Sequence, residues 1–97
     1  MSTTTKKELI DRIAATTKTR RAVVKPVIQM FLDEMVRELA NGHRLEFRDF
    51  GVFETKRRAA RRAQNPKTLE PVEVSARRVV KFKMGRLVKQ KLNGRRP

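Results

Sequence analysis

The 97-residue sequence contains no cysteine, so neither a disulfide framework nor a thiolate metal site can stabilise it. Long apolar runs are also missing, and none approaches the roughly 20 residues that a membrane span requires. The first ten residues, MSTTTKKELI, have no apolar core of the kind found in a signal peptide. We therefore expect a soluble, intracellular protein of one domain with no membrane partner.

The residue types that carry most enzyme chemistry are equally scarce. The one histidine, His43, follows a glycine at the expected end of a helix, and no Ser/His/Asp set or glycine-rich phosphate loop is recognisable. Asp33 and Glu34 are more simply explained as the solvated face of a helix than as a catalytic pair. We therefore expect a protein that is not an enzyme and that uses no cofactor, no metal and no small-molecule substrate.

Positive charge is what the sequence has in excess. Lysine and arginine number 25 against 10 acidic residues, which gives a net charge of +15. Residues 51–97 hold 15 basic and 3 acidic side chains (net +12), whereas residues 1–50 hold 10 and 7 (net +3). Such an asymmetry creates a strong positive potential on one part of the molecule and attracts polyanions to it. Nucleic acid is therefore the expected partner, and a basic surface without a ligand is the alternative.

Two helices are predicted in the first forty residues. Thr5 and Glu8 have the spacing of a capping box, in which each side chain bonds the other residue's backbone amide, so the first helix starts there. A second helix is predicted over residues 19–40, where apolar residues recur at helical spacing in a stripe wider than one face. A helix of this kind must be covered from two directions. Asn41-Gly42 is expected to end it, because glycine readily adopts the left-handed conformation that follows a helix.

Pro26 conflicts with the second helix. It lies about seven residues into the predicted segment, where a proline removes one hydrogen bond and clashes with the preceding turn. We therefore expect either a kink at Pro26 or a helix that starts near Lys25.

The rest of the chain is predicted to form strands and then a short helix. Residues 44–48 alternate in polarity, DFG at 49–51 carries a turn, and VFET at 52–55 begins a second strand. A third strand is predicted in residues 72–83 and a C-terminal helix in residues 84–94. The apolar side chains expected to turn inward at this end are Met84, Leu87, Val88 and Leu92. The order predicts an α+β fold with two N-terminal helices, a three-stranded antiparallel sheet and a short C-terminal helix.

The segment RRAARRAQNPKTLEP, residues 57–71, contains too little apolar surface to build a core. If the strands around Phe53 and Val80 pair antiparallel, the pairing places a four-residue turn at Asn65–Thr68, where Asn and Pro are favoured. Residues 56–77 then form a two-stranded arm with a reach of about 33 Å, at about 3.3 Å per residue. Because a domain of this size has a radius of only about 13 Å, the arm is expected to project into solvent.

The arm has a composition suited to binding nucleic acid. Arginines flank its strands while alanines keep it thin, which fits a groove of duplex DNA. At the tip, Pro66 is expected to act as a wedge between base pairs, and an ordinary turn proline is the alternative. The DNA contacts expected on the arm are Arg57, Arg58, Arg61, Arg62, Gln64, Asn65, Lys67, Thr68, Arg77 and Arg78.

Together these features resemble a known family. The order of elements, the segments FRDFGVFETKRRA and SARRVVKFKMG, and the tip QNPKT are similar to the bacterial HU and integration host factor family of histone-like DNA-bending proteins. The resemblance covers about Lys6 to Leu92. It implies an intertwined dimer in which each subunit places one arm in the minor groove, with Pro66 inserted at a kink. It also implies a dimer core built from Phe31, Phe47, Phe50, Phe53 and Phe82.

The resemblance further implies phosphate contacts on the flanks of the body. Some of them are expected near Gly85, where the third helix is expected to present free amides. These candidates are Lys6, Arg48, Lys81, Lys83 and Arg86. The sequence also departs from the family pattern: Gln64 stands where arginine is usual, Leu69 where glycine is usual, and Met84 where proline is usual. Loss of the arginine at the tip is expected to weaken its grip or to alter its base preference.

We therefore expect one domain over residues 1–97, with a body at about 5–55 and 78–93, an arm at about 56–77, and flexible tails at 1–4 and 94–97. The expected protein is a cytoplasmic, nucleoid-associated homodimer that bends and compacts double-stranded DNA with little base-specific readout. A heterodimer with a paralogue is the alternative assembly. The alternative functions are a site-preferring bending factor like integration host factor and, less favoured, a basic RNA-binding or ribosome-associated protein.

Overall fold

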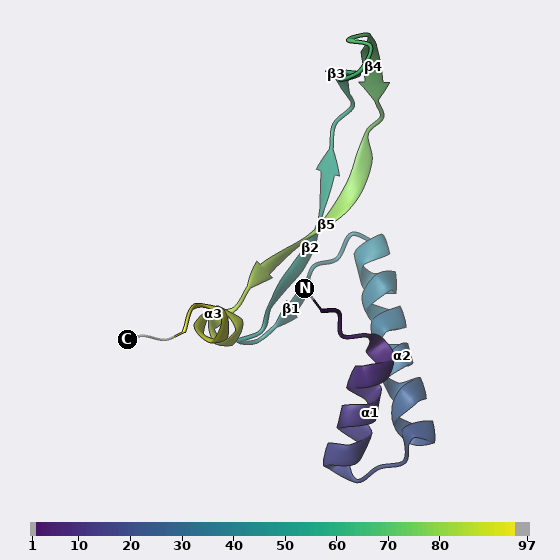
Figure 1. Cartoon of the computed structure of the whole chain (residues 1–97), viewed down its shortest axis with the longest axis vertical. Coiled ribbons are helices and arrows are strands. Elements are labelled where there is room, and N and C mark those ends of the chain that lie inside the picture. Colours follow the sequence, from purple (N-terminus) through teal and green to yellow (C-terminus); the bar gives the residue numbers. More distant parts are fainter. Residues whose placement is uncertain (1, 95–97) are drawn as a thin grey trace. The chain divides into compact units, whose positions relative to one another are not determined.

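The computed structural model describes residues 2–94 and confirms the expected order of helices and strands (Figure 1). Met1 and residues 95–97, at the ends of the two expected tails, lie outside the described residues. The elements are α1 (Lys6–Thr17), α2 (Arg21–Ala40), β1 (Leu45–Phe47), β2 (Gly51–Arg58), β3 (Arg61–Gln64), β4 (Pro71–Val74), β5 (Arg77–Met84) and α3 (Arg86–Asn93). The chain divides into two compact units, with the boundary between residues 37 and 38. The expected single domain therefore stays a prediction.

The start of α1 is held by the capping box that the sequence predicts. The backbone N–H of Glu8 donates to Thr5 Oγ1 at 3.3 Å, and the backbone N–H of Thr5 donates to Glu8 Oε1 at 3.1 Å. Both amides would otherwise lack a partner within the helix. At the other end Lys18 adopts the left-handed conformation, with φ 53°, and terminates the helix.

The second helix tolerates Pro26 in its second turn. α2 begins at Arg21, where the backbone amide of Val24 donates to the Arg20 carbonyl at 3.1 Å, so the expected start near Lys25 is wrong. A proline this close to the start of a helix removes only one backbone hydrogen bond, and the apolar stripe that follows sustains the rest. The helix ends as predicted, with Gly42 at φ 83° and its N–H donating to the Leu39 carbonyl at 3.0 Å.

The two helices of the first unit are joined by side chains as well as by their loop. Arg21 Nε lies 2.6 Å from Asp11 Oδ1, and this hydrogen bond lowers the pKa of Asp11 below its ordinary value. Ile10 on α1 and Val24 on α2 are the two buried apolar side chains of the described chain. This unit therefore has a very small apolar core of its own.

The sheet of the second unit has the strand order β1-β2-β5, with both pairings antiparallel, as the sequence predicts. β1 pairs only with Gly51–Phe53, whereas β2 pairs with β5 along its whole length to Arg58. Beyond Phe53 the sheet therefore narrows to a two-stranded ribbon, which β3 and β4 extend. The arm residues 56–77 are exposed apart from Ala63, Asn65 and Val74, which are half-buried.

The register of the ribbon differs from the predicted one by two residues. Phe53 pairs with Phe82 and Gln64 with Pro71, so the tip is a six-residue loop, Asn65–Glu70, and the four-residue turn at Asn65–Thr68 is wrong. The loop is closed by backbone bonds from Asn65 N–H to the Glu70 carbonyl (2.9 Å) and from Leu69 N–H to the Asn65 carbonyl (2.7 Å). A shift of two residues keeps every side chain on its predicted face.

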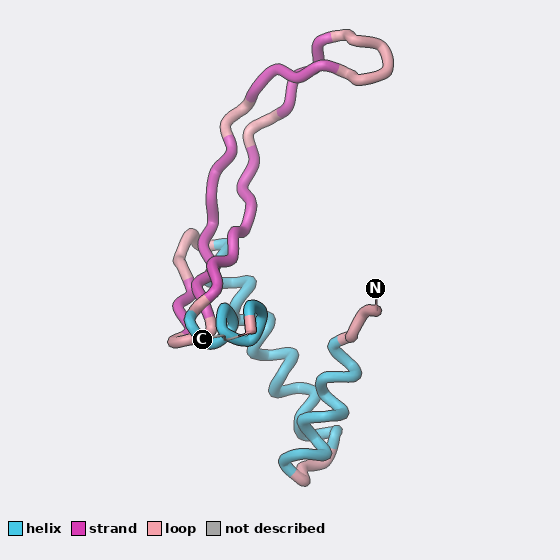
Figure 2. Tube along the Cα trace, turned by 60° about the vertical axis from the view of Figure 1, so that its left-hand side comes forward, coloured by secondary structure: helices cyan, strands magenta, loops and turns pink. Residues whose placement is uncertain are grey.

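Both strands of the ribbon are interrupted at the same level, as Figure 2 shows. Residues 59–60 separate β2 from β3, and residues 75–76 separate β4 from β5. The pairing resumes in the same register, so the four unpaired residues face one another across the ribbon. They are all small: Ala59, Ala60, Ser75 and Ala76.

Most large apolar side chains of the described chain are exposed, Phe31 by 51 % and Phe50 by 48 % among them. The phenylalanines of the second unit form a cluster, in which the rings of Phe53 and Phe82 have centroids 4.7 Å apart. Of the side chains expected to turn inward around α3, only Val88 is half-buried, and the expectation is wrong for the single chain at Met84, Leu87 and Leu92. Nothing within residues 2–94 covers these three side chains.

Gly85 is predicted to be required for the junction between β5 and α3. A Cβ atom at this position would lie 2.7 Å from the backbone carbonyl carbon of Asp49. The backbone of Gly85 cannot easily move away, because its N–H donates a hydrogen bond to the Phe50 carbonyl at 2.8 Å. Gly85→Ala should therefore lower the free energy of unfolding by about 1–3 kcal/mol, the usual cost of overpacking. Chemical denaturation at fixed protein concentration measures the change.

The matched control is Gln90→Ala, on the exposed surface of α3, which should change stability by less than about 0.5 kcal/mol. Equal stability of Gly85→Ala and the unsubstituted protein would contradict the close packing at this junction.

Candidate nucleic-acid interface

The pairing of β2 with β5 sorts their side chains onto two chemically different faces. Residues directly opposite each other share a face, and successive residues alternate between faces. One face carries Phe53, Phe82 and Val80, followed toward the arm by Arg57 and Arg78. The other, the basic face, has one acidic side chain, Glu54, and five exposed basic ones: Lys56, Arg58, Arg77, Lys81 and Lys83. The structure therefore brings part of the expected arm and part of the expected phosphate clamp together on one surface.

Lys56 belongs to the basic face but is not among the residues predicted from the sequence. It lies two positions before Arg58 on β2 and opposite Val79 on β5. The period-two alternation of a strand, counted back from Arg58, contains enough information to find it.

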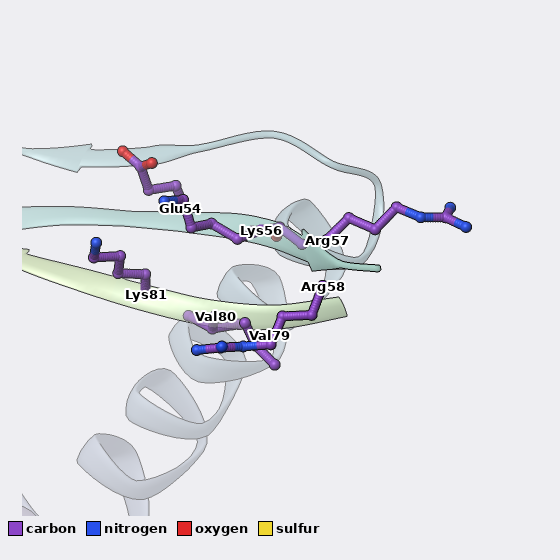
Figure 3. Close-up of a pocket in the computed structure, with 8 residues that line it drawn as sticks. Glu54, Lys56, Arg57, Arg58, Val79, Val80 and Lys81 are labelled. Carbon is purple, nitrogen blue, oxygen red and sulfur yellow. The ribbon is translucent and has the colours of Figure 1, made fainter. Parts of the chain in front are cut away.

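Two pairs of arginines face each other directly across the ribbon. Arg57 is opposite Arg78, and Arg58 is opposite Arg77. Like charges in such positions destabilise a strand pair. Figure 3 shows Arg57 and Arg58 pointing in different directions, as the alternation requires. This part of the arm therefore carries an unfavourable charge arrangement that a bound anion would relieve.

Arg78 is held in place by the end of α2. Its guanidinium donates to the backbone carbonyls of Leu39 (3.1 Å) and Ala40 (3.0 Å), and Thr55 Oγ1 also donates to the Leu39 carbonyl at 3.1 Å. The last carbonyls of a helix lack partners within it, and a cation near them is favourable. Arg78, predicted as a DNA contact, therefore also anchors the base of the arm.

An open pocket of about 640 Å³ lies at the base of the arm (Figure 3). Its polar lining includes one carboxylate among several cations. The lining residues are Glu54, Thr55, Lys56, Arg57, Arg58, Val79, Val80 and Lys81. The excess of cations in this lining gives the pocket a positive potential that attracts anions.

The outer arm carries less net positive charge than the base of the arm. Arg61 and Arg62 are exposed on β3, where Arg62 lies opposite the acidic Glu73. Between these and the tip, Ala63 lies opposite Val72. The outer arm is therefore thin and combines cationic with small apolar side chains.

Asn65 organises the loop at the tip. Its Oδ1 accepts hydrogen bonds from the backbone amides of Lys67 (2.9 Å) and Thr68 (3.3 Å), an arrangement typical of turns that begin with asparagine. Pro66 is exposed within the same loop, as are Lys67 and Thr68. Gln64 does not extend freely, because its Nε2 donates to the Leu69 carbonyl at 3.1 Å. The side chains of Asn65 and Gln64 are therefore engaged in hydrogen bonds within the loop.

The candidate phosphate clamps are partly engaged with other side chains. Lys83 Nζ lies 3.4 Å from Glu54, and Arg86 Nε lies 3.6 Å from Asp49, so an incoming phosphate competes with these carboxylates. Lys81 lies opposite the same Glu54. Arg48 is in the turn that joins β1 to β2. All four belong to the second unit.

Lys6 belongs to the first unit, where its ammonium donates to Gln29 Oε1. At the start of α3, the Gly85 and Leu87 amides already donate to the carbonyls of Phe50 and Asp49. The expectation of free amides is therefore wrong for these two groups, because the β1–β2 turn satisfies them.

Within residues 2–94, no group of three or more His, Asp or Glu side chains could hold a metal ion. None of the described helices combines the length and the apolar character needed to cross a membrane.

Comparison with known proteins places this geometry in context. The sequence model of the bacterial DNA-binding protein family matches residues 4–93. The chain is 45 % identical over 91 residues to a probable DNA-binding protein HU of Chlamydia trachomatis, covering 93 % of this chain and 91 % of that protein. It is 39 % identical over 95 residues to the integration host factor subunit alpha of Psychrobacter arcticus, covering 98 % and 96 %.

A solved structure extends the similarity to three dimensions. HU of Anabaena, in a cocrystal with DNA, superposes with a TM-score of 0.86 at 30 % sequence identity, covering 95 % of this chain and all of that one. Both the sequence and the fold therefore match over nearly the whole length. The chain belongs to the bacterial DNA-binding protein family that includes HU and integration host factor.

Proposed function

We propose that the protein is an architectural DNA-binding protein whose arm lies in the minor groove of duplex DNA and whose Pro66 enters between base pairs and bends the duplex. The observation that carries this proposal is the exposed arm, residues 56–77, with facing arginine pairs at its base and a proline in its loop. Minor-groove architectural proteins combine cationic contacts with apolar wedges in this way. The HU relative crystallised with DNA supports the same partner.

The basic face supplies the affinity in this proposal. Arg58 and Arg77 have no ion pair within the described residues, so they meet phosphates without displacing a carboxylate. Lys81 and Lys83 continue the same surface along β5 toward the turn. The cations of the ribbon therefore form a track for the phosphate backbone, which positions the protein without reading bases.

The second part of the proposal is a dimer. Ile10 and Val24 are the only buried apolar side chains of the described residues, while apolar residues along α2, such as Val27, Met30 and Val36, are each more than 60 % exposed. Soluble monomers rarely expose so many large apolar side chains on one helix. A second copy of the chain covers these residues in the proposal, and each dimer carries two arms. The phenylalanines predicted as dimer core, including Phe31, then lie at or near the shared core.

Integration host factor relatives favour a second candidate, a bending protein that prefers particular sites. Minor-groove contacts distinguish mainly A·T from G·C pairs, so such a preference would come from the deformability of the DNA. In both cases the protein would act on the chromosome, in the nucleoid. Bending of random-sequence and A·T-rich duplexes of equal length, compared side by side, separates the two candidates.

Pro66→Ala should reduce DNA bending. The substitution removes about two methylene groups from the tip, worth about 1.6 kcal/mol if they are buried in DNA, so affinity should fall about tenfold. Fluorescence energy transfer between dyes at the ends of a short duplex measures the bend. Pro71→Ala is the matched control, since Pro71 is in β4 outside the loop. Equal bending by Pro66→Ala and unsubstituted protein would refute the wedge.

Affinity for DNA should fall steeply as salt rises. Each neutralised phosphate contributes about −0.9 to the slope of log K against log salt. Arg58→Gln combined with Arg77→Gln should make the slope shallower by about 2, as measured by fluorescence anisotropy titrations. Arg44→Gln is the control, because Arg44 pairs with Glu46 outside the ribbon. An unsubstituted protein with a nearly flat slope would contradict the phosphate track.

Light scattering at micromolar concentration should give twice the 11.3 kDa mass of one chain. Val36→Glu places a charge on the face proposed to be shared and should shift the mass toward the monomer or unfold the chain. Glu34→Gln, on an exposed polar position of the same helix, should remain dimeric. A monomeric mass for the unsubstituted protein would overturn the dimer.

A further inference from the structure

The loop at the tip presents two apolar side chains and not one. Besides Pro66, it contains Leu69, whose side chain is 64 % exposed. No apolar neighbour covers it in the described chain, and the outermost part of the arm holds no other large hydrophobic residue between Arg61 and Pro71. An exposed leucine gains nothing from its apolar surface while the arm is free.

The backbone of Leu69 is also in an unfavourable conformation. Its φ of 63° lies in the left-handed region, where a residue with a Cβ atom is disfavoured and glycine is not. The loop nevertheless holds it there on both sides: Leu69 N–H donates to the Asn65 carbonyl at 2.7 Å, and the Leu69 carbonyl accepts from Gln64 Nε2 at 3.1 Å. A strained residue that its surroundings fix in place is a marker of function.

We propose that Leu69 is a second DNA-contacting residue of the tip, packing its side chain against the bases beside Pro66, and that Gln64 is the residue that positions it. This rests on the proposed function and adds a contact to it. Leucine is among the side chains that minor-groove proteins wedge between base steps. Burial against bases would recover the apolar surface that the free arm leaves in water.

The charges around the loop identify duplex DNA as the occupant. Arg61 and Arg62 are exposed just below the tip, and the loop itself holds one exposed cation, Lys67, and one exposed carboxylate, Glu70. An apolar point with a net excess of cations beside it complements a base step, which has an apolar stacking face between two phosphate chains. An apolar groove on another protein would not offer negative charge on both sides of the apolar face.

Leu69→Gly tests the proposal, because strain and DNA contact predict opposite results. Glycine relieves the strain of the left-handed backbone and leaves the hydrogen bonds of the loop intact. If Leu69 had no role, the substitution would therefore leave the affinity for DNA equal or higher. If Leu69 packs against bases, affinity should instead fall about tenfold, the value of burying one leucine side chain. Asparagine also tolerates this backbone conformation but is polar, so Leu69→Asn should lower the affinity by a similar factor.

Gln64→Met tests the positioning role, since methionine has similar length but no donor for the Leu69 carbonyl. It should lower affinity less than Leu69→Gly does, and adding it to Leu69→Gly should cause no further loss, because it acts through Leu69. Permanganate oxidation of unstacked thymines gives a readout that a purely structural role would not move. The unsubstituted protein should create reactive thymines, and both variants should create fewer.

The outcomes separate this inference from the proposed function. An unsubstituted protein that neither binds nor bends duplex DNA overturns both. Normal binding and bending by the unsubstituted protein, together with equal or tighter binding by Leu69→Gly, overturns the role of Leu69 alone. An additive loss in the double variant overturns the role of Gln64 while leaving that of Leu69 in place.

Discussion

The antiparallel pairing of β2 with β5 is the interaction on which the rest of the second unit depends. Because opposite residues share a face, this one register gathers the phenylalanine cluster on one side and the basic face on the other. A slip of a single residue would exchange the two faces and place Phe53 among the lysines. The same register carries the strands onward into the arm, so the sheet that packs and the ribbon that binds are one continuous element.

The second constraint is the shortage of buried apolar surface. A short chain can bury only a limited fraction of its surface, and this one directs much of its length into a ribbon that buries almost nothing. Only two apolar side chains, Ile10 and Val24, are buried in the described residues. The proposed dimer would supply the missing burial, because the widest apolar stripe of the sequence lies on a helix, α2, much of which is exposed in the single chain.

Much of this structure could be predicted from the sequence because periodicity is a local property. The capping box at Thr5, the helix end at Gly42 and the alternation around Phe53 all follow from neighbouring residues. Lys56 was missed although the local alternation contains it, whereas two other details arise from features that no local pattern contains. The tip is two residues wider than predicted and holds Leu69 in a conformation that residue preferences reserve for glycine, and Arg78 turns to a helix end that lies far from it in the sequence.

The features that look unfavourable in the free chain are concentrated on the arm. Facing arginines, an exposed leucine with a left-handed backbone and a break at four small residues all lower the stability of an isolated two-stranded ribbon, which is marginal in any case. None of them would be expected in a segment that serves only to hold a fold together. Under the proposed function each would become favourable, or harmless, beside an anionic duplex: phosphates would separate the arginines, bases would cover the leucine, and a break lined by alanines and a serine would let the strands follow a curved groove. Instability in the free arm and affinity for DNA are, under the proposed function, consequences of the same residues.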